Sequence, residues 1–259
     1  MKQKLYQTMI ELTNGRGTSA MLKTFATSRI SRYLIPGYTK LYAINTQEVS
    51  KSLQQFSTLH DFFTRELKEE ARPIASADDI IVSPVDAKIE SFGAITEGQN
   101  FVVKGKSYRL VDLLGKEARA EAYKDGQYIV FYLSPADYHR MHSPLDATVL
   151  RQYTLGQQSY PVNQAGLSYG KKPLSHNYRM VTQLQHKKMR CDFIKVGAMF
   201  VNSIALTNTT TAWYKGEEVG YFSFGSTVVM LFEKDSVAFT EDVVKNRMIR
   251  VGEAFATML

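Results

Sequence analysis

The stretch Tyr221-Phe-Ser-Phe-Gly-Ser-Thr-Val-Val-Met-Leu-Phe232 reads as β-strand on both sides of one irregular position, Gly225-Ser226. Aromatic and β-branched residues favour strands, whereas a glycine inside a strand weakens it and marks a bulge or a close backbone approach. Two interpretations are open from these residues. The dipeptide is a bulge followed by an ordinary strand serine, or Ser226 carries a hydroxyl placed to attack the carbonyl of Gly225.

Short strand-like segments precede this stretch, and Gly, Asn, Asp and Pro separate many of them. The predicted strands are 80–83, 88–93, 101–103, 127–133, 148–153, 179–185, 190–196, 201–206, 218–224 and 227–232. Segments 111–120 and 243–258 have helical spacing within or after this region. The spacing therefore predicts a β-rich body that begins near Pro73.

The front of the chain has a helical pattern instead. Residues 3–12 and 19–34 have helix-compatible apolar spacing. A capping-box pattern at Thr58 and Asp61 begins a further helix, which Pro73 bounds. Its predicted buried stripe consists of Leu59, Phe62, Phe63 and Leu67. The predicted fold class is α+β, with N-terminal amphipathic helices in residues 1–72 and a body of short, mostly antiparallel strands in residues 73–259.

Bulk properties restrict the class of protein. With 259 residues the chain is long enough for one large domain or for a core with a smaller appendage. The single Cys191 excludes an intrachain disulfide and any multi-cysteine metal site, which is typical of a reducing compartment. No apolar run has the length that a bilayer span needs, and the N-terminal residues lack the apolar core of a signal peptide. A soluble or peripherally attached cytoplasmic protein is expected.

The net charge of +7 is concentrated at the front of the chain. Residues 1–40 contain seven basic residues and one acidic residue, and therefore carry +6 of that charge. The basic residues alternate with large apolar ones, as in segments that lie on an anionic lipid surface. The alternative is a helical cap with a solvated basic face. No nucleic-acid partner is expected, because a nucleic-acid binder would spread its basic residues over a folded reading surface.

Two histidines, His139 and His142, lie three residues apart in the segment 132–144, directly after an apolar strand. Loops at strand ends commonly present catalytic groups. Three interpretations are open: metal ligands, structural turn residues, or a base for a nucleophile elsewhere. No metal is expected, because nothing convincing supplies the remaining ligands.

Asp86 lies in a proline-containing break between two predicted strands, where an aspartate is often only a turn residue. Taken together, however, Asp86, His142 and Ser226 supply the orienting carboxylate, base and nucleophile of a triad. Such a triad is recognised by roles and geometry and not by sequence order. A nucleophile-elbow hydrolase is not supported, because Ser226 lacks the Gly-x-Ser-x-Gly context.

These residues resemble the phosphatidylserine decarboxylases, a family of self-processing pyruvoyl enzymes. The resemblance runs in consistent order from about residue 60 to about residue 233. It is carried by Phe224-Gly225-Ser226-Thr227, Tyr138-His139-Arg140-Met141-His142, Ser83-Pro84-Val85-Asp86, Phe62-Phe63-Thr64-Arg65-Glu66-Leu67, Arg72-Pro73-Ile74, Val103-Lys104-Gly105, Leu113-Leu114-Gly115, Pro161-Val162-Asn163, Val196-Gly197-Ala198 and Lys215–Phe222. The chain departs from the family pattern at Ala87, Phe224 and Tyr178, and Tyr178 leaves the family's glutamate at that position without a counterpart.

The resemblance implies self-cleavage between Gly225 and Ser226, with His142, held by Asp86, as the base. The products are a large β chain, 1–225, and a small α chain, 226–259, which stay associated as a heterodimer. Ser226 becomes a covalent pyruvoyl cofactor, whose ketone forms a Schiff base with the substrate amine. By the same resemblance His139 handles protons during decarboxylation. Lys104, which lies near the end of a predicted strand, is a candidate substrate-binding residue on that position alone.

The implied substrate is phosphatidylserine in an anionic membrane, converted to phosphatidylethanolamine and CO₂. The implied location is the cytoplasmic side of the cell membrane, as a peripheral protein that could form homo-oligomers. Two alternatives stay open from the sequence. One is a pyruvoyl-dependent decarboxylase of another serine lipid or amino acid, and the other is a non-enzymatic membrane-binding module.

Overall fold

The computed structural model describes residues 21, 23–96, 98–162, 164–198, 204–223 and 225–259. The first expected helix, 3–12, lies outside the described residues, as do most of residues 1–22. The described α-helices are α3 (Ile35–Leu41), α4 (Leu59–Phe63), α5 (Leu110–Leu114), α6 (Glu117–Glu121), α7 (Gln164–Tyr169) and α8 (Pro173–His176). Short 3-10 helices span Arg29–Leu34, Thr46–Glu48, Leu53–Gln55 and Glu69–Ala71.

The strands are β1 (Ile80–Val82), β2 (Ala87–Ala94), β3 (Asn100–Val103), β4 (Lys106–Arg109), β5 (Gln127–Leu133), β6 (Arg140–His142), β7 (Ala147–Leu155), β8 (Arg179–His186), β9 (Met189–Gly197), β10 (Ile204–Leu206), β11 (Ala212–Trp213), β12 (Glu218–Phe222), β13 (Ser226–Phe232), β14 (Val237–Phe239), β15 (Met248–Ile249) and β16 (Ala254–Met258). Every described strand pair within the sheets is antiparallel. The predicted α+β class, with a β-rich body behind N-terminal helices, is confirmed for the described residues.

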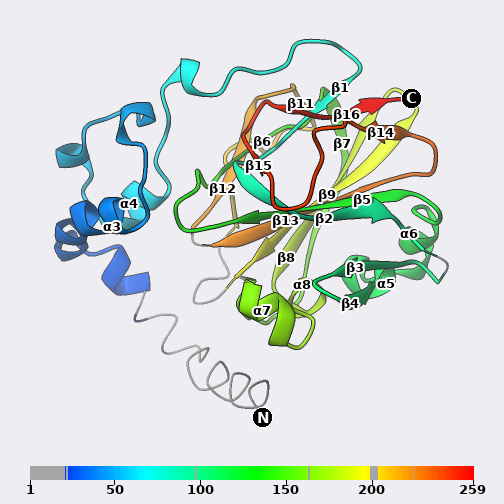
Figure 1. The fold of residues 1–259 in the computed structure, drawn as a ribbon, viewed down its shortest axis with the longest axis horizontal. Coiled ribbons are helices and arrows are strands. Elements are labelled where there is room, and N and C mark those ends of the chain that lie inside the picture. The colour runs from blue at the N-terminus through cyan, green and yellow to red at the C-terminus, as the bar shows by residue number, and fades with distance from the viewer. Residues whose placement is uncertain (1–20, 22, 97, 163, 199–203, 224) are drawn as a thin grey trace.

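An eight-stranded sheet with the order β11-β7-β8-β9-β13-β5-β2-β15 forms the centre of the body (Figure 1). Strand β13 is paired on both sides, and all seven of its residues are buried. Its side chains alternate between two cores: Val228 contributes to one and Val229 to the other. A strand with both faces covered reads as a continuous apolar run, which is what residues 227–232 show.

Different elements cover the two faces of this sheet. The sheets β1-β16-β14 and β10-β12-β6 supply residues such as Phe255 and Phe222 to the core on one face. The hairpin β3-β4 and helices α5 to α8 supply residues such as Phe101 and Leu113 to the core on the other. Burial on both faces holds β13 in a single register, because a slip of one residue would exchange its two sets of side chains.

Of the two interpretations of Gly225-Ser226, the structure does not support a bulge within one strand. Strand β12, which ends at Phe222, belongs to the three-stranded sheet β10-β12-β6, whereas β13 begins at Ser226 in the eight-stranded sheet. The glycine therefore lies where the chain crosses from one sheet to another, and not within one strand. The sequence shows only a local break, because the pairing partners that separate β12 from β13 are distant in the chain.

The predicted helix over 243–258 is also wrong, because these residues contain β15 and β16. Asn246 and Gly252 adopt left-handed φ values of 69° and 86°, which a helix does not allow. A side chain at Gly252 would approach the carbonyl oxygen of Pro73 to 2.4 Å. The apolar spacing resembled a helix because two short strands and their turns place apolar residues at similar intervals.

Two other helix predictions are confirmed in part. The segment 111–120 is helical, but Gly115 (φ 76°) ends α5 before α6 begins. At Thr58 the side chain accepts a hydrogen bond from the Asp61 backbone N–H, as a capping residue does. Helix α4 ends at Phe63, however, so that Leu67 lies beyond the helix and forms a backbone bridge with Val49. Leu67 still packs, like Leu59, against the small core that contains Phe62.

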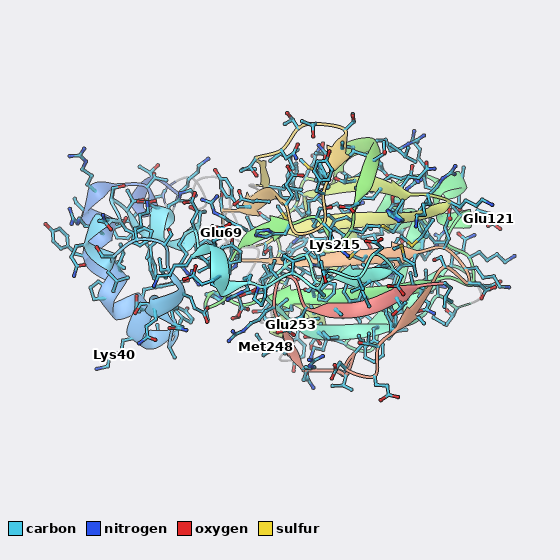
Figure 2. All side chains as sticks on the ribbon, turned by 90° about the horizontal axis from the view of Figure 1, so that it is seen from above. Lys40, Glu69, Glu121, Lys215, Met248 and Glu253 are labelled. Atoms are coloured by element: carbon cyan, nitrogen blue, oxygen red, sulfur yellow. The ribbon has the colours of Figure 1, made fainter. Side chains whose placement is uncertain are left out.

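The described N-terminal helical elements form a cluster at one end of the molecule, with the β-rich body at the other (Figures 1 and 2). A small core of its own, formed by Ile35, Val49, Phe56 and Phe62, holds this cluster together. None of the described helices is both long and apolar enough to cross a membrane.

Lys195 of β9 is fully buried on the same face of the sheet as Phe193 and Trp213. Its amino group donates a hydrogen bond to the Thr182 hydroxyl and lies 4.5 Å from the Phe193 ring centre. Burial lowers the pKa of Lys195 to about 7. An unfolded lysine stays protonated to about pH 10.4. Below pH 7 the amine is therefore charged in both states, and folding carries the full free-energy cost of burying that charge. That cost decreases as the pH rises from 7 to 10.

We expect Lys195→Met to raise the thermal unfolding midpoint at pH 7 by about 5 °C, which corresponds to a gain on the order of 2 kcal/mol for a chain of this size. The gain should shrink as the pH approaches 10, because the wild-type amine is then neutral in both states. Differential scanning calorimetry at several pH values measures it. The exposed Lys234, replaced in the same way, is the control and should show no such trend. A gain that does not depend on pH would contradict the assignment.

Candidate functional site

One end of the eight-stranded sheet collects the residues that the sequence analysis selected. Ser226 opens β13 and pairs with Leu133, the last residue of β5, and with Gly197, the last residue of β9. Strand β2 begins beside the end of β5, immediately after Asp86. The antiparallel topology therefore places Asp86, Ser226 and the loop after Leu133 at the same end of the sheet.

The loop after Leu133 contacts the chain on both sides of the Gly225–Ser226 bond. On the C-terminal side, Leu133 pairs with Ser226. On the N-terminal side, the carbonyl of His139 accepts a hydrogen bond from the backbone N–H of Phe222 at 2.9 Å. The six residues that lead from Leu133 to His139 thus run alongside the crossing between the two sheets.

Ser226 itself is fully buried, and its Oγ has no hydrogen-bond partner among the described residues. A buried hydroxyl without a partner costs free energy, so native proteins leave few of them. At Gly225, by contrast, a Cβ atom would meet no described atom within 4 Å. With respect to the described residues, the serine oxygen is therefore uncommitted, and no atom crowds the backbone of the preceding residue.

His139 is fully buried against the Phe63 ring, with 4.0 Å between the ring centres. Its Nδ1 lies 2.8 Å from the carbonyl oxygen of Asp137, so Nδ1 carries the proton and donates it to that oxygen. The Nε2 atom is then an acceptor, and it has no partner among the described residues. Burial lowers the pKa of His139 to about 3, which keeps the ring neutral near pH 7.

His142 has both ring nitrogens engaged. Nδ1 donates to the carbonyl oxygen of Gly216 at 2.8 Å, and Nε2 accepts from the hydroxyl of Tyr138 at 3.1 Å. Burial lowers the pKa of His142, and the charges of Glu218 and Asp86 partly oppose this effect. Its neutral Nε2 can act as a base once the Tyr138 hydroxyl moves away from it.

Asp86 and His142 are neighbours without a hydrogen bond between their side chains. The backbone N–H of His142 donates to the Pro84 carbonyl at 2.8 Å, so the turn before Asp86 runs alongside the histidine. The Asp86 carboxylate instead binds Arg72, at 2.9 and 3.0 Å from Nε, and the Val251 backbone N–H at 2.9 Å. The predicted contact through which Asp86 orients His142 is therefore absent from this structure, although both residues belong to one site.

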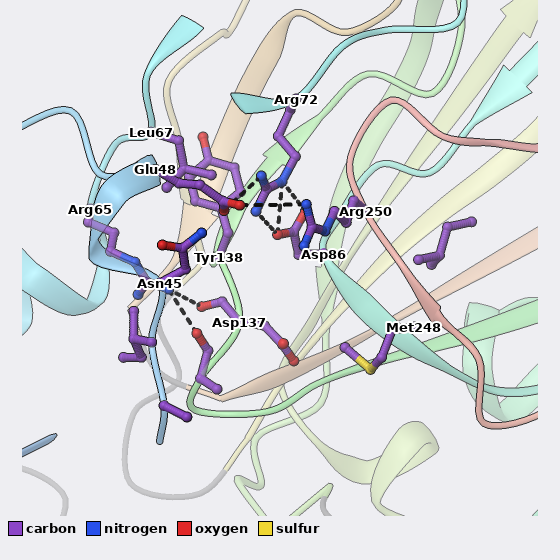
Figure 3. A pocket seen from close by; sticks show the side chains of 14 residues that line it. Asn45, Glu48, Arg65, Leu67, Arg72, Asp86, Asp137, Tyr138, Met248 and Arg250 are labelled. Atoms are coloured by element: carbon purple, nitrogen blue, oxygen red, sulfur yellow. Dashed lines mark hydrogen bonds and ion pairs between the residues drawn. The ribbon is translucent and has the colours of Figure 1, made fainter. Parts of the chain in front are cut away.

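A cavity of about 250 Å³ lies beside this site, between the N-terminal helical cluster and the body (Figure 3). Asp86, Asp137 and Tyr138 form part of its wall on the side of the sheet. Arg65 and Arg72 line it from the helical side. The cavity thus shares walls with the histidine loop and with the Asp86 turn.

Residues 62–67, which comprise the end of helix α4 and the four residues after it, attach the helical cluster to the histidine loop. Phe63 contacts the His139 ring, and Arg65 donates to the carbonyl oxygens of Ala136 and Asp137 at 2.8 and 3.1 Å. Arg140 donates to the carbonyl oxygen of Thr64 at 3.0 Å. This segment therefore helps to hold the loop that contains both histidines.

Lys104 does not line this cavity. Its amino group forms an ion pair with the buried carboxylate of Glu90 at 2.5 Å. Lys88 lies 3.4 Å from the same carboxylate, so Lys104 helps to balance a buried charge. The structure therefore gives Lys104 a structural partner, and its contact with substrate stays a prediction.

Two arginines and a tyrosine of the site were not predicted to have site roles. Arg65, Arg72 and Tyr138 occur within motifs that the sequence analysis quoted, yet nothing in their spacing shows what they contact. Their contacts join residues such as Arg72 and Asp86 across turns that only the folded chain brings together. The one signal in the sequence that could have indicated a site role was an arginine within an otherwise apolar motif or at a helix end.

The site also contains no described metal cluster. Among the described residues, no three His, Cys, Asp or Glu side chains are arranged to hold a metal ion. The uncommitted groups are instead a hydroxyl, a neutral imidazole nitrogen and an arginine. These groups suit proton transfer and attack on a carbonyl carbon.

Comparison with known proteins gives a consistent result. Residues 59–257 match a family model described as Phosphatidylserine decarboxylase. The chain is 50% identical over 259 residues to proteins named Phosphatidylserine decarboxylase proenzyme from Bacillus thuringiensis (strain Al Hakam) and Bacillus cereus (strain 03BB102), which covers 100% of this chain and 99% of each relative. The protein of the same name from Bacillus mycoides (strain KBAB4) is 50% identical over 257 residues, covering 99% of this chain and 98% of that protein.

Proposed function

The chain belongs to the phosphatidylserine decarboxylase family, and on this premise we propose that it decarboxylates phosphatidylserine to phosphatidylethanolamine with a pyruvoyl group made from Ser226. The observation that carries the proposal is the buried Ser226 hydroxyl, which has no partner among the described residues and directly follows Gly225 at the crossing between two sheets. The name proenzyme, shared by the relatives, agrees with a chain that is processed.

Self-cleavage would begin when a base removes the Ser226 proton and Oγ attacks the carbonyl carbon of Gly225. The peptide C–N bond then breaks in an N→O acyl shift, which leaves an ester and a free amine on residue 226. Loss of the Cα proton and of the ester oxygen releases the Gly225 carboxylate and leaves dehydroalanine. Addition of water and loss of ammonia convert this residue to the pyruvoyl group, so the products are chains 1–225 and 226–259.

Hydrogen bonds between strands would keep the two chains together after cleavage. Ser226 opens a strand that is paired along its whole length with β5 and β9, both of which belong to the large chain. Burial of all seven β13 residues adds the apolar contribution of that strand. A stable heterodimer is the proposed active form.

We assign His142, beside Asp86, to cleavage and His139 to proton transfer during decarboxylation. The uncommitted Nε2 of His139 and the neutral rings of both residues support their use as proton acceptors. The pyruvoyl carbonyl supplies the electron sink for loss of CO₂ from the substrate. The protein contributes a buried, water-poor site and the neutral imidazoles that receive and return protons.

The membrane surface is the proposed location of the substrate. Seven large apolar side chains in the range 21–42 are exposed: Met21, Phe25, Ile30, Tyr33, Leu34, Leu41 and Tyr42. Lys23, Arg29, Arg32 and Lys40 lie among them in the sequence. Each basic residue near an anionic bilayer contributes about 1 kcal/mol, and apolar side chains add their transfer free energy. We propose that this surface binds the cytoplasmic leaflet peripherally.

We expect the double variant Ile30→Glu, Tyr33→Glu to lose at least about tenfold in binding to vesicles that contain phosphatidylserine, because these two side chains are 70% and 81% exposed. Self-cleavage should not change. Vesicle co-sedimentation measures binding, and denaturing mass spectrometry measures cleavage. Tyr214→Glu, at a 68% exposed tyrosine of the body, is the matched control and should bind like wild type. Equal losses in both variants would contradict the assigned surface.

Intact mass under denaturing conditions, combined with an assay on phosphatidylserine vesicles, tests the proposed function. Two fragments that meet at Gly225/Ser226, the smaller one without a free amine, are expected together with CO₂ release. A single full-length species in active protein would contradict the mechanism. Release of CO₂ from free serine but not from vesicles would favour the alternative, a pyruvoyl decarboxylase of another substrate. Processed protein that releases CO₂ neither from phosphatidylserine vesicles nor from free serine would favour the other alternative, a non-enzymatic membrane-binding module.

A further inference from the structure

Arg65 is a buried cation beside the site that the mechanism above does not use. Only 4% of its surface is exposed, and it lines the cavity beside the histidine loop. One terminal nitrogen donates to the Ala136 and Asp137 carbonyls, whereas Nε and the other terminal nitrogen have no hydrogen-bond partner among the described residues. Because a buried charge without a counter-ion is costly, this arrangement calls for an anion.

The other two arginines of the cavity already have carboxylate partners. Arg72 binds Asp86 and lies 3.0 Å from Glu48, and Arg250 lies 3.5 Å from Glu48. Within the described part of the chain, no carboxylate lies within ion-pair distance of the Arg65 guanidinium. Asp137 is near, but its carboxylate accepts from the Ser134 backbone N–H at 2.6 Å. Arg65 is therefore the arginine of this cavity that is left without a carboxylate (Figure 3).

The position of Arg65 links this unpaired cation to the proposed reaction. Its guanidinium holds the backbone at Ala136 and Asp137, three and two residues before His139. The walls of this cavity also include Asp86 and Tyr138, and the Tyr138 hydroxyl contacts His142, the base assigned to cleavage. A substrate whose amine reaches residue 226 would therefore extend its head group toward this cavity.

The head group of phosphatidylserine carries two anions, a carboxylate and a phosphodiester. A strong ion pair to the carboxylate would stabilise the ground state and oppose its departure as CO₂, because that charge is lost in the transition state. The phosphodiester keeps its charge throughout the reaction. The planar guanidinium also matches the geometry of phosphate oxygens, which it binds in a bidentate manner.

We infer that Arg65 binds the phosphodiester of the lipid head group through Nε and its free terminal nitrogen. This inference rests on the proposed function, since it takes residue 226 as the position of the substrate amine. It makes Arg65 a substrate-binding residue that acts on affinity and leaves the chemical step unchanged. Loss of its side chain should therefore weaken only those amines that carry a phosphate.

Three soluble amines separate the contributions of the head group: ethanolamine, O-phosphoethanolamine and L-serine. Each is trapped on the small chain by cyanoborohydride, and the mass of that chain gives the concentration for half-maximal trapping. In the wild type we expect the concentration for half-maximal trapping to be at least about tenfold lower for O-phosphoethanolamine than for ethanolamine. In Arg65→Gln this advantage should fall below about twofold, while ethanolamine and L-serine behave as in the wild type. Arg65→Lys should restore part of the advantage.

Arg109→Gln is the matched control, because Arg109 is exposed and lies outside the cavity. It should leave all three amines unchanged. An Arg65→Gln variant that loses its preference for L-serine instead would assign Arg65 to the carboxylate and overturn the inference. Equal weakening of all three amines, or failure to self-cleave, would assign Arg65 to the structure of the loop at Ala136 and likewise overturn it. A wild-type protein that traps no amine would overturn the proposed pyruvoyl function itself.

Discussion

Replacing Ser226 with alanine is expected to leave the chain as a single uncleaved polypeptide without detectable decarboxylase activity. The hydroxyl is the proposed nucleophile and also the precursor of the cofactor, so its loss removes both stages at once. The methyl group fits the same buried position at the start of β13, and Oγ has no described hydrogen bond to lose. Folding should therefore be retained, and intact mass with a vesicle assay measures the result.

Thr227 offers a matched control one residue away. Its hydroxyl is likewise fully buried and without a partner among the described residues, but it has no assigned role in cleavage. The isosteric change Thr227→Val should preserve self-cleavage at Gly225–Ser226 and most of the activity. A Thr227→Val protein that stays uncleaved would show that the loss of cleavage is not specific to the Ser226 hydroxyl. Cleavage in Ser226→Ala would contradict the proposed chemistry directly.

Separate replacement of the two histidines should divide the two stages of the reaction. We expect His142→Ala to stay uncleaved, because it removes the base assigned to Ser226. We expect His139→Ala to be cleaved but slower in decarboxylation by about 10²–10⁴-fold, the usual contribution of general acid–base catalysis. Intact mass measures the first stage, and CO₂ release per processed chain measures the second.

His186 is the control for histidine loss, because it lies at the β8–β9 turn, at the opposite end of the sheet from Ser226. His186→Ala should be processed and active. If His139→Ala stays uncleaved while His142→Ala is processed, the two roles are reversed. That reversed outcome has a structural basis, since Nε2 of His139 is uncommitted whereas Nε2 of His142 accepts from Tyr138.

Local patterns in the sequence predicted much of the body. The segments 127–133, 179–185 and 190–196 form strands with nearly the predicted bounds. They could be predicted because buried strands have continuous apolar, β-branched composition and turn residues at both ends. The prediction failed at 243–258, where left-handed turns at Asn246 and Gly252 interrupt an apolar spacing that also fits a helix.

The candidate site was predictable in its chemistry but not in its contacts. The residue types predicted a nucleophile, two bases and an orienting carboxylate in Ser226, His139, His142 and Asp86. The fold gathers these four residues at one end of the sheet. The sequence did not show that Asp86 binds Arg72, or that the Tyr138 hydroxyl donates a hydrogen bond to Nε2 of His142. Side-chain partners of this kind depend on distances between distant segments, for which spacing along the chain carries no information.

Gly225-Ser226 separates what the sequence determined from what only the tertiary structure decided. The sequence by itself determined the reactive residue types, a strand after Ser226 and a break before it. Only the tertiary structure decided that the break is a crossing between two sheets, that the Ser226 hydroxyl has no described partner, and that no described carboxylate pairs with the buried Arg65. The physical reason is that strand composition is a local property, whereas pairing, burial and charge balance are set by segments far apart in the chain.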